Sequence, residues 1–243
     1  MRNLKRTLSL ALASVMLVGM MSVGASAVNA SDFTDADEIV NKDAVSTMTA
    51  LGIINGKEDG SYFDPTGNVT RAEMAKMLCV AINGGVDPVL GVKDTPTFTD
   101  IKGTWAESYI EYCAANGIIA GRGNNKFDPT GTVSATEAAK MLLGVLGYNA
   151  EKSGLVGNDW AINTNVLANQ NGLYKKLANL NANTLLTRDN AAQMIYNALD
   201  ANMVELNAAG NYTTSQYSYT GTESVVTGTE RVWVVKIKDS SVN

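Results

Sequence analysis

Thr70-Arg71-Ala72-Glu73-Met74-Ala75-Lys76-Met77-Leu78 is the stretch that decides the fold, because it recurs as Ser134-Ala135-Thr136-Glu137-Ala138-Ala139-Lys140-Met141-Leu142. In both copies a hydroxyl residue stands three positions before a glutamate. This is the pattern of a capping box, which satisfies the first free backbone N–H groups of a helix. Apolar residues then recur at helical spacing, so each copy is predicted to be a helix with one buried face.

The repetition extends on both sides of these helices, at a shift of about 65 residues. Phe33-Thr34-Asp35 recurs as Phe98-Thr99-Asp100, residues 51–56 recur as 116–121, and residues 63–66 recur as 127–130. A weaker third copy follows at a shift near 55 and contains Trp160-Ala161, Asn171-Gly172-Leu173 and Thr187-Arg188-Asp189-Asn190. An ordered repeat of this period indicates tandem structural units.

Each unit is predicted to be a helix, a loop and a second helix. The first helix ends at Gly52, Gly117 or Gly172, since glycine readily takes the left-handed conformation that closes a helix. The loop ends in an Asp-Pro turn. In the second unit the buried face of the first helix is expected to include Trp105, Tyr109, Ile110, Cys113 and Ala114. The methionines of the second helices are predicted to be core, although such a stripe also occurs in adaptable binding grooves.

Composition limits the function. Of the 243 residues, 45% are apolar and 18% are charged, which is typical of a folded chain with a low charge content. There is no histidine. This excludes Ser-His-Asp and Cys-His triads and HExxH zinc sites, which need an imidazole. No cofactor is predicted.

The first thirty residues are predicted to be a cleaved secretory signal. Arg2, Lys5 and Arg6 precede an apolar stretch from Leu8 to Val23, and small residues follow near Ala27 and Ala30. An uncleaved membrane anchor is the alternative, but a spanning helix needs about 20 apolar residues. Cleavage leaves 16 Lys and Arg against 24 Asp and Glu, a formal charge of −8. Without a basic patch, nucleic acid is not expected as a partner, nor is a membrane after cleavage.

The expected divisions are the signal at 1–30, units at 31–90, 91–150 and 151–204, and a tail at 205–243. The tail is rich in Ser, Thr, Gly and Tyr, and residues 231–238 are predicted to be a strand. A hairpin packed on the helices, a self-assembly strand and the start of a longer region are all compatible with it. Cys79 and Cys113 fall at apolar helical positions and are expected to be buried thiols, with pairing left open after export.

The repeated motifs resemble the S-layer homology domain of bacterial surface proteins. The similarity lies in F-x-D, W-A, G-I-I-x-G, G-x-F-x-P and T-R-A-E, and it covers roughly residues 32–199. The family implies a mostly α fold in which three helix-loop-helix units surround a helical bundle with pseudo-threefold symmetry. It also implies non-covalent anchoring to the wall through a secondary cell wall polymer, often one with a pyruvate ketal on an amino sugar, bound in grooves between units. Self-association in a surface layer is a further expectation.

Ligand-binding candidates follow from this resemblance. A guanidinium offers a carboxylate two parallel hydrogen bonds, and an aromatic ring covers the apolar face of a sugar. Asp35 and Asp100 are candidates as acceptors of sugar hydroxyls, with capping of the first helix as the alternative. The arginines are treated as surface residues whose replacement by alanine changes stability by about 0.5 kcal/mol or less. The candidates are Arg71, Arg188, Trp105, Trp160, Asp35, Asp100, Gly56 and Gly121.

Departures from the pattern leave no unit complete. Val40 replaces the tryptophan in the first unit, Ala135 replaces the arginine in the second, and the third lacks the F-x-D aspartate and the G-x-F-x-P loop. The pairing of arginine with tryptophan is left open, either Arg71 with Trp105 or Arg188 with Trp160.

Two other functional classes remain as alternatives. The first is an exported glycan hydrolase that uses carboxylates such as Asp64 and Asp128. Both aspartates precede proline in a repeated loop, however, which favours turn chemistry over an asymmetric catalytic pair. The second is a calcium-binding module of the dockerin type at residues 55–66. Lys57 and Thr66 occupy positions in it where calcium ligands are needed, and no metal site is predicted.

Overall fold

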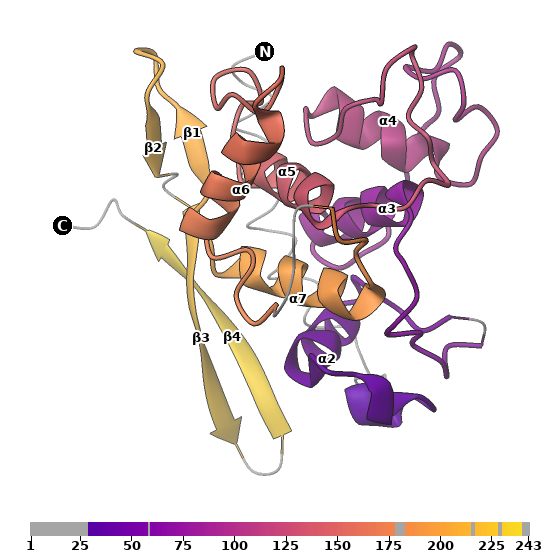
Figure 1. Cartoon of the computed structure of the whole chain (residues 1–243). Helices are drawn as coiled ribbons and strands as arrows, with labels where there is room; N and C mark the ends of the chain where they lie inside the picture. Colours follow the sequence, from indigo (N-terminus) through magenta and orange to yellow (C-terminus); the bar gives the residue numbers. More distant parts are fainter. Residues whose placement is uncertain (1–28, 58, 178–182, 215–216, 228–229, 240–243) are drawn as a thin grey trace.

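The computed structural model describes residues 29–57, 59–177, 183–214, 217–227 and 230–239, and the chain is mostly helical (Figure 1). Three helix-loop-helix units follow one another, and we name them units 1, 2 and 3. Short 3-10 helices, η1 (Ala30–Asp32) and η2 (Ala36–Glu38), precede the first unit. The units consist of α2 (Lys42–Ala50) with α3 (Arg71–Ile82), α4 (Glu107–Ala115) with α5 (Ala135–Val145), and α6 (Trp160–Gln170) with α7 (Arg188–Leu199).

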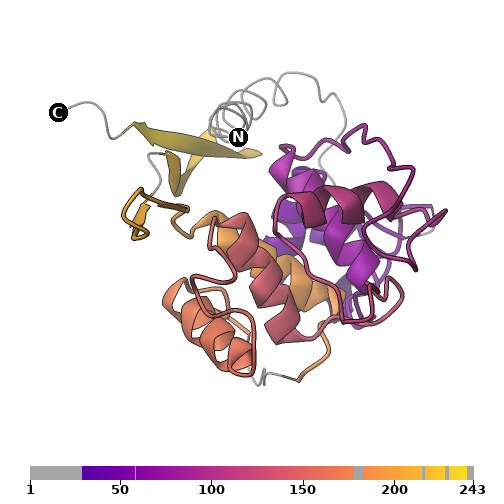
Figure 2. The same ribbon diagram turned by 90° about the horizontal axis from the view of Figure 1, so that it is seen from above.

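Helices pack mainly across the boundaries between units. The second helix of each unit lies on the first helix of the next: α3 on α4, α5 on α6, and α7 back on α2 (Figure 2). The second helices also contact one another, α3 with α5 and α5 with α7. The units therefore close into a ring around a central bundle, as the fold prediction requires.

Backbone hydrogen bonds complete this ring just before the second helices. Val69 N–H donates to Leu186 O, Leu186 N–H to Val133 O, and Val133 N–H to Val69 O, each at 2.9 Å. All three residues are fully buried. Because a buried N–H must find an acceptor and each of these finds it in another unit, no unit satisfies its own backbone here. The cyclic exchange defines the pseudo-threefold axis.

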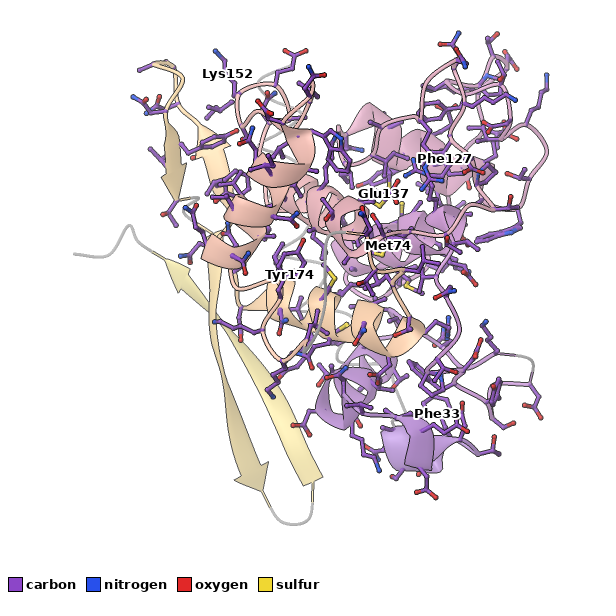
Figure 3. All side chains as sticks on the ribbon, viewed as in Figure 1. Phe33, Met74, Phe127, Glu137, Lys152 and Tyr174 are labelled. Carbon is purple, nitrogen blue, oxygen red and sulfur yellow. The ribbon has the colours of Figure 1, made fainter. Side chains whose placement is uncertain are left out.

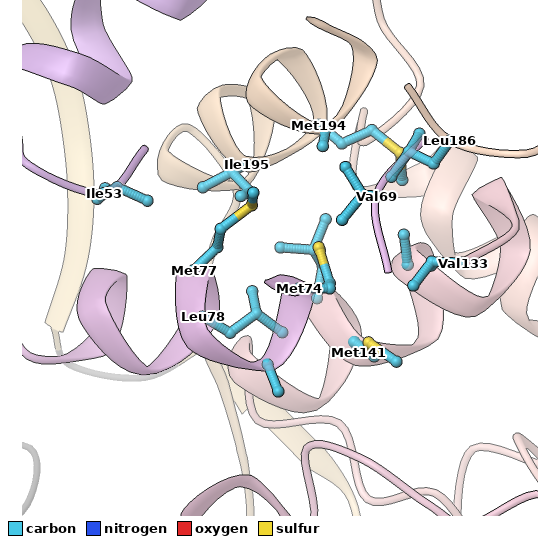
Figure 4. Close-up of a cluster of buried hydrophobic side chains, with 14 of the residues drawn as sticks. Ile53, Val69, Met74, Met77, Leu78, Val133, Met141, Leu186, Met194 and Ile195 are labelled. Carbon is cyan, nitrogen blue, oxygen red and sulfur yellow. The ribbon is translucent and has the colours of Figure 1, made fainter. Parts of the chain in front are cut away.

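The core lies around this axis and is formed by the second helices (Figure 4). Met74 and Met194 have no exposed surface, and Met77 and Met141 are at most 6% exposed. The prediction that the methionine stripes are core is confirmed.

Local signals placed the helix ends correctly. The Thr70 and Ser134 side chains accept hydrogen bonds from the N–H groups of Glu73 and Glu137. The carboxylates of these glutamates in turn accept from the backbone N–H groups of Thr70 and Ser134. Gly52, Gly117 and Gly172 lie just after the first helices with φ of 70°, 70° and 69°. One assignment was wrong: α4 begins at Glu107, and Trp105 is 60% exposed and not part of the buried face.

The tail forms two antiparallel hairpins, β1 (Val204–Leu206) with β2 (Tyr212–Thr214), and β3 (Tyr217–Thr227) with β4 (Glu230–Asp239). The predicted strand at 231–238 is confirmed in β4. The first hairpin docks on unit 2, where Val204 N–H donates to Leu146 O at 2.8 Å and the Tyr212 ring lies 5.1 Å from that of Tyr148. The predicted signal segment lies outside the described residues, except for Asn29 and Ala30.

Candidate functional site

Arg71 is the first residue of α3, and its side chain crosses into unit 2. Its Nε donates to Phe127 O at 2.8 Å and its Nη2 to Ala120 O at 2.7 Å, while Nη1 lies 3.4 Å from Glu137 Oε1. The guanidinium carbon is 4.3 Å from the centroid of the Phe127 ring. Arg71 is only 3% exposed, and burial lowers its pKa. The group therefore fastens the loop of unit 2 to the start of α3.

Arg188 repeats this arrangement between units 3 and 1. Its Nε donates to Phe63 O at 2.8 Å and its Nη2 to Asn55 O at 2.9 Å, and it is 5% exposed. The expectation that the two arginines are surface residues is wrong. The starts of α3 and α7 do not face water but pack against the loop of another unit. The carbonyl groups of that loop accept hydrogen bonds from the arginine.

Asp35 and Asp100 hold the same loops from the other side. The Asp35 carboxylate accepts from the N–H groups of Phe63 and Asp64 at 2.9 and 2.7 Å. Asp100 accepts from Phe127 and Asp128, at 2.8 Å in both cases. Burial opposes ionisation of Asp100, but these two N–H groups outweigh it and its pKa lies below the usual value. Asp35 makes no side-chain cap to η2, so capping is not its role.

Each of these pairs of hydrogen bonds, to Asp35 or to Asp100, ends on a residue whose backbone is in the left-handed region. Asp64 and Asp128 both have φ of 63°, a conformation that costs energy outside glycine. Their carboxylates are taken up by Lys57 Nζ and Arg122 Nη1, each at 2.6 Å. These repeated aspartates are therefore turn residues in ion pairs, as the turn interpretation predicts.

Gly56 and Gly121 sit where the loops are too tight for a side chain. A Cβ on Gly56 would lie 2.2 Å from Gly60 O, and one on Gly121 would lie 2.7 Å from Lys126 O. The carbonyl groups just before them, of Asn55 and Ala120, are the ones that Arg188 and Arg71 bind. Both glycines thus allow the loop shape on which the arginine contacts depend.

Trp160 begins α6, and its ring faces a lysine of α5. Lys140 Nζ lies 5.2 Å from the ring centroid, within cation–π range. Burial lowers the pKa of Lys140, and the positive charge of Arg71 lowers it further, while Glu137 acts in the opposite direction. Across the part of the chain that the structure describes, Lys140 makes no ion pair. We call Glu137, Lys140 and Trp160 the α5–α6 junction (Figure 3 labels Glu137).

An equivalent surface, the α3–α4 junction, consists of Lys76, Trp105, Tyr109 and Asp87. Lys76 Nζ lies 5.4 Å from the Tyr109 ring centroid and 3.1 Å from Asp87 Oδ2. The rings of Trp105 and Tyr109 are 6.3 Å apart, and a hydrogen bond to Asp87 raises the pKa of Tyr109 to about 12. Here the lysine already has a carboxylate partner.

The third boundary, α7 on α2, has neither group. Gln193 stands where the lysine would be and is buried against Asn197, and Val40, in the tryptophan position, is 83% exposed.

Lys76 and Lys140 were not selected from the sequence. The signal was present, since a lysine follows the capping glutamate by three residues in both clear copies, even where Ala135 replaces the arginine. Neither pairing considered from the sequence, Arg71 with Trp105 or Arg188 with Trp160, matches the electrostatic interactions in the structure. Arg71 interacts electrostatically with Glu137 and with Lys140, which lies beside Trp160. Arg188 interacts electrostatically with Glu73, one turn before Lys76.

Residues 32–75 and 97–139 match the model of the S-layer homology domain. Units 1 and 2 therefore each contain an S-layer homology domain. The matched segments run from the F-x-D motif into the second helix of units 1 and 2. Unit 3 lies outside them, yet it takes the third position in the ring of backbone hydrogen bonds.

The relatives of this chain include surface proteins. The S-layer protein of Bacillus licheniformis is 32% identical over 111 residues, which cover 46% of this chain and 12% of that protein. The cell surface protein of Thermoanaerobacter kivui is 28% identical over 207 residues, 84% of this chain and 26% of that protein. Exoglucanase XynX of Acetivibrio thermocellus is 29% identical over 156 residues, 60% of this chain and 14% of that enzyme. The chain thus spans between about an eighth and a quarter of these relatives.

S-layer homology domains and surface-protein relatives together indicate cell-wall anchoring at the cell surface. Among the described residues, no helix is long and apolar enough to cross a membrane. The same residues contain no cluster of three or more acidic or cysteine side chains arranged to hold a metal ion.

Proposed function

We propose that this chain anchors an exported protein to the cell wall by binding a secondary cell wall polymer, and that the α5–α6 junction is the principal site. The observation that carries the proposal is the half-buried ammonium of Lys140 over the Trp160 ring without a carboxylate partner in the described structure. A half-buried cation without a counter-ion gains most from an anionic ligand. The two S-layer homology domains and the surface-protein relatives support a polymer of the wall as that ligand.

The chemistry favours an anionic sugar. An aromatic ring packs on the apolar C–H face of a pyranose, while an ammonium pairs with a carboxylate at its edge. A pyruvylated amino sugar carries both features, and we propose it as the ligand. A carboxylate bound directly to Arg71 or Arg188 would have to displace two carbonyl groups and, for Arg71, approach Glu137. Their part in binding is therefore to hold the loops in place.

The α3–α4 junction is proposed as a weaker second site, because Lys76 must exchange Asp87 for the ligand. Catalysis is not part of the proposal: Asp64 and Asp128, the carboxylates of the hydrolase alternative, are held in turns by Lys57 and Arg122. In the calcium alternative, Lys57 stands at the third position, where a ligand is needed, and its ammonium is bound to the Asp64 carboxylate. Self-association in a surface layer remains a proposal that rests on the relatives alone.

The protein without its first thirty residues is expected to sediment with purified cell walls and to remain in solution when the walls have been stripped of their non-peptidoglycan polymer. Chemical removal of pyruvate ketals from otherwise intact walls is expected to weaken binding strongly, because the ammonium then loses its carboxylate. Equal retention on stripped walls would assign the ligand to peptidoglycan and contradict the proposal. Full retention after ketal removal alone would contradict only the identity of the anion.

Lys140→Gln is expected to weaken wall binding about tenfold, the effect of losing a charge-assisted contact of about 1.4 kcal/mol. Its melting temperature should stay close to that of the parent, since unit 3 already carries Gln193 at this position. Lys152→Gln is the matched control, because it removes the same charge from an exposed position (Figure 3 labels Lys152). Equal loss of binding in both variants would mean that diffuse charge carries the interaction, and the junction would have to be abandoned.

A further inference from the structure

The two cysteines of the chain meet each other across a unit boundary. Cys79 lies on α3 of unit 1 and Cys113 on α4 of unit 2, separated by 34 residues. Their sulfur atoms are 3.3 Å apart. The sequence of 243 residues contains no other cysteine. Two cysteines placed independently in a chain of this length would rarely be neighbours, so their contact calls for an explanation.

The local geometry turns the two side chains toward one another. Cys79 Sγ donates to Tyr109 O at 3.5 Å, and Cys113 Sγ donates to Ala75 O at 3.6 Å. Each acceptor lies one helical turn before the other cysteine. The thiols therefore occupy the point where α3 and α4 cross, and they are 1% and 0% exposed.

Packing alone does not require sulfur at this crossing. The ninth residue of the second helix and the residue four before the closing glycine are Cys79 and Cys113 here. At the other two crossings the same positions hold Leu143 with Ala168, and Tyr196 with Met48. Ordinary apolar side chains thus fill this place twice. Only the boundary between units 1 and 2 has cysteine, and it has cysteine on both sides.

We propose that Cys79 and Cys113 form an intramolecular disulfide that staples unit 1 to unit 2 once the protein is outside the cytoplasm. The location comes from the proposed function, because disulfides persist in oxidising surroundings and not in the cytosol. The sulfurs need to approach from 3.3 Å to about 2.05 Å, which adjustment of the two side chains at a helix crossing supplies. The bond closes a loop that contains the whole linker between α3 and α4.

The oxidation is an exchange with an external disulfide, either a small one such as oxidised glutathione or that of a thiol oxidoreductase. One cysteine thiolate attacks a sulfur of that disulfide, forms a mixed disulfide and releases one thiol. The second cysteine then attacks the mixed disulfide, forms the Cys79–Cys113 bond and releases the other thiol. Two protons leave the protein, and the external disulfide takes up the two electrons.

The step belongs to folding. In the folded chain the hydrogen bond with Cys79 and burial raise the pKa of Cys113, so the reactive thiolate is suppressed there. Exchange is therefore expected while α3 and α4 are still open, and the completed bond is then shielded from reductants by the core around it. The bond should accordingly resist reduction in the native protein and yield to it after denaturation.

The test is to refold the full chain in glutathione buffers that range from fully reduced to mostly oxidised, and to count free thiols by alkylation after denaturation. We expect a monomer with no free thiol at the oxidised end, lighter by two hydrogen atoms in intact mass. Its melting temperature should exceed that of the reduced form by about 10 °C, from the unfolded-state constraint on a loop of this length. The double variant Cys79→Ala/Cys113→Ala should show no dependence of melting on the buffer.

Two further measurements complete the test. Cys79→Ala alone should leave one thiol that forms only mixed or intermolecular disulfides, and protein released from cell surfaces should be found oxidised. Two free thiols in the oxidised buffer, or dimers in place of the monomer, would overturn the proposal. The refolding, thiol-counting and melting readouts do not use the wall, so a failure of polymer binding leaves them unaffected. A bond that forms in the buffer while surface protein stays reduced would refute the surface disulfide.

Discussion

Arg71→Ala is expected to lower the free energy of unfolding by about 3 to 5 kcal/mol, the range for breaking a buried charged contact by removing one partner. The substitution leaves the carbonyl groups of Phe127 and Ala120 without their donors and removes the guanidinium from the Phe127 ring. It also opens a cavity at a residue that is 3% exposed. In a chain of this size such a loss lowers the melting temperature by about 10 °C or more.

Denaturant unfolding of three variants distinguishes this from a general effect of charge. Arg71→Lys should be intermediate, because an ammonium replaces one of the two carbonyl contacts but cannot reproduce the fork. Arg188→Ala should resemble Arg71→Ala, since it removes the equivalent contacts to Phe63 and Asn55. Lys102→Ala, at an exposed position between Asp100 and α4, should change the free energy of unfolding by about 0.5 kcal/mol or less.

An unchanged melting temperature for Arg71→Ala would mean that the guanidinium is free in solution, and it would restore the arginine as the direct ligand of the polymer. Wall binding by this variant is expected to fall as well, but through loosening of the loop at residues 120–127. Arg71→Lys separates the two roles: a positioning role predicts that affinity follows stability across the arginine variants, whereas a direct ligand predicts loss of affinity without loss of stability.

The parts of the fold that could be predicted from the sequence depend on neighbouring residues. Capping boxes at Thr70 and Ser134, and the glycines that close the first helices, are decided within one helical turn. Their recurrence then fixed the unit and, with it, the fold class. The buried methionine stripe followed from helical periodicity in the same way.

The rest depends on contacts between units, for which the sequence carries no local signal. Whether Arg71 faces water or a carbonyl group is decided by a loop about fifty residues further on. Trp105 was assigned to a buried face because its spacing is helical, but the helix begins after it. In the sequence, Lys140 is a lysine on a predicted helix with no sign of a special role. Only the packing of unit 2 on unit 3 places it over the Trp160 side chain.

The stability of the fold is also expected to depend strongly on one carboxylate that holds these loops, that of Asp100. Asp100→Asn is expected to lower the free energy of unfolding at neutral pH by about 2 to 3 kcal/mol. The carboxylate accepts two backbone N–H groups, and the amide that replaces it accepts only one while turning its own NH₂ toward the other. The N–H group left without an acceptor belongs to Phe127 or to Asp128. The hydrogen bonds to Asp100 help to hold Asp128 in its left-handed conformation, with φ of 63°.

The same contact predicts how stability responds to acid. The pKa of Asp100 is lowered in the folded state, so its contribution is fully present above the unfolded pKa of about 3.9 and is lost as the pH falls through the folded pKa. Glu137 has the same sign: burial raises its pKa, but the Ser134 N–H and Arg122 outweigh that and lower it. Asp189 has the opposite sign, because burial raises its pKa and its charge is a cost at neutral pH.

Unfolding measured from neutral pH down to about pH 2 tests the assignment, because the gap between parent and Asp100→Asn should shrink once the parent also protonates the carboxylate. Asp94→Asn is the matched control, since it removes a carboxylate at an exposed site six residues earlier and should change the free energy of unfolding by about 0.5 kcal/mol or less. A gap that stays constant through the acid range would mean that the amide disturbs the loop by its shape alone. The carboxylate would then not be the group that holds residues 127 and 128, and the loops would owe their position to the arginines.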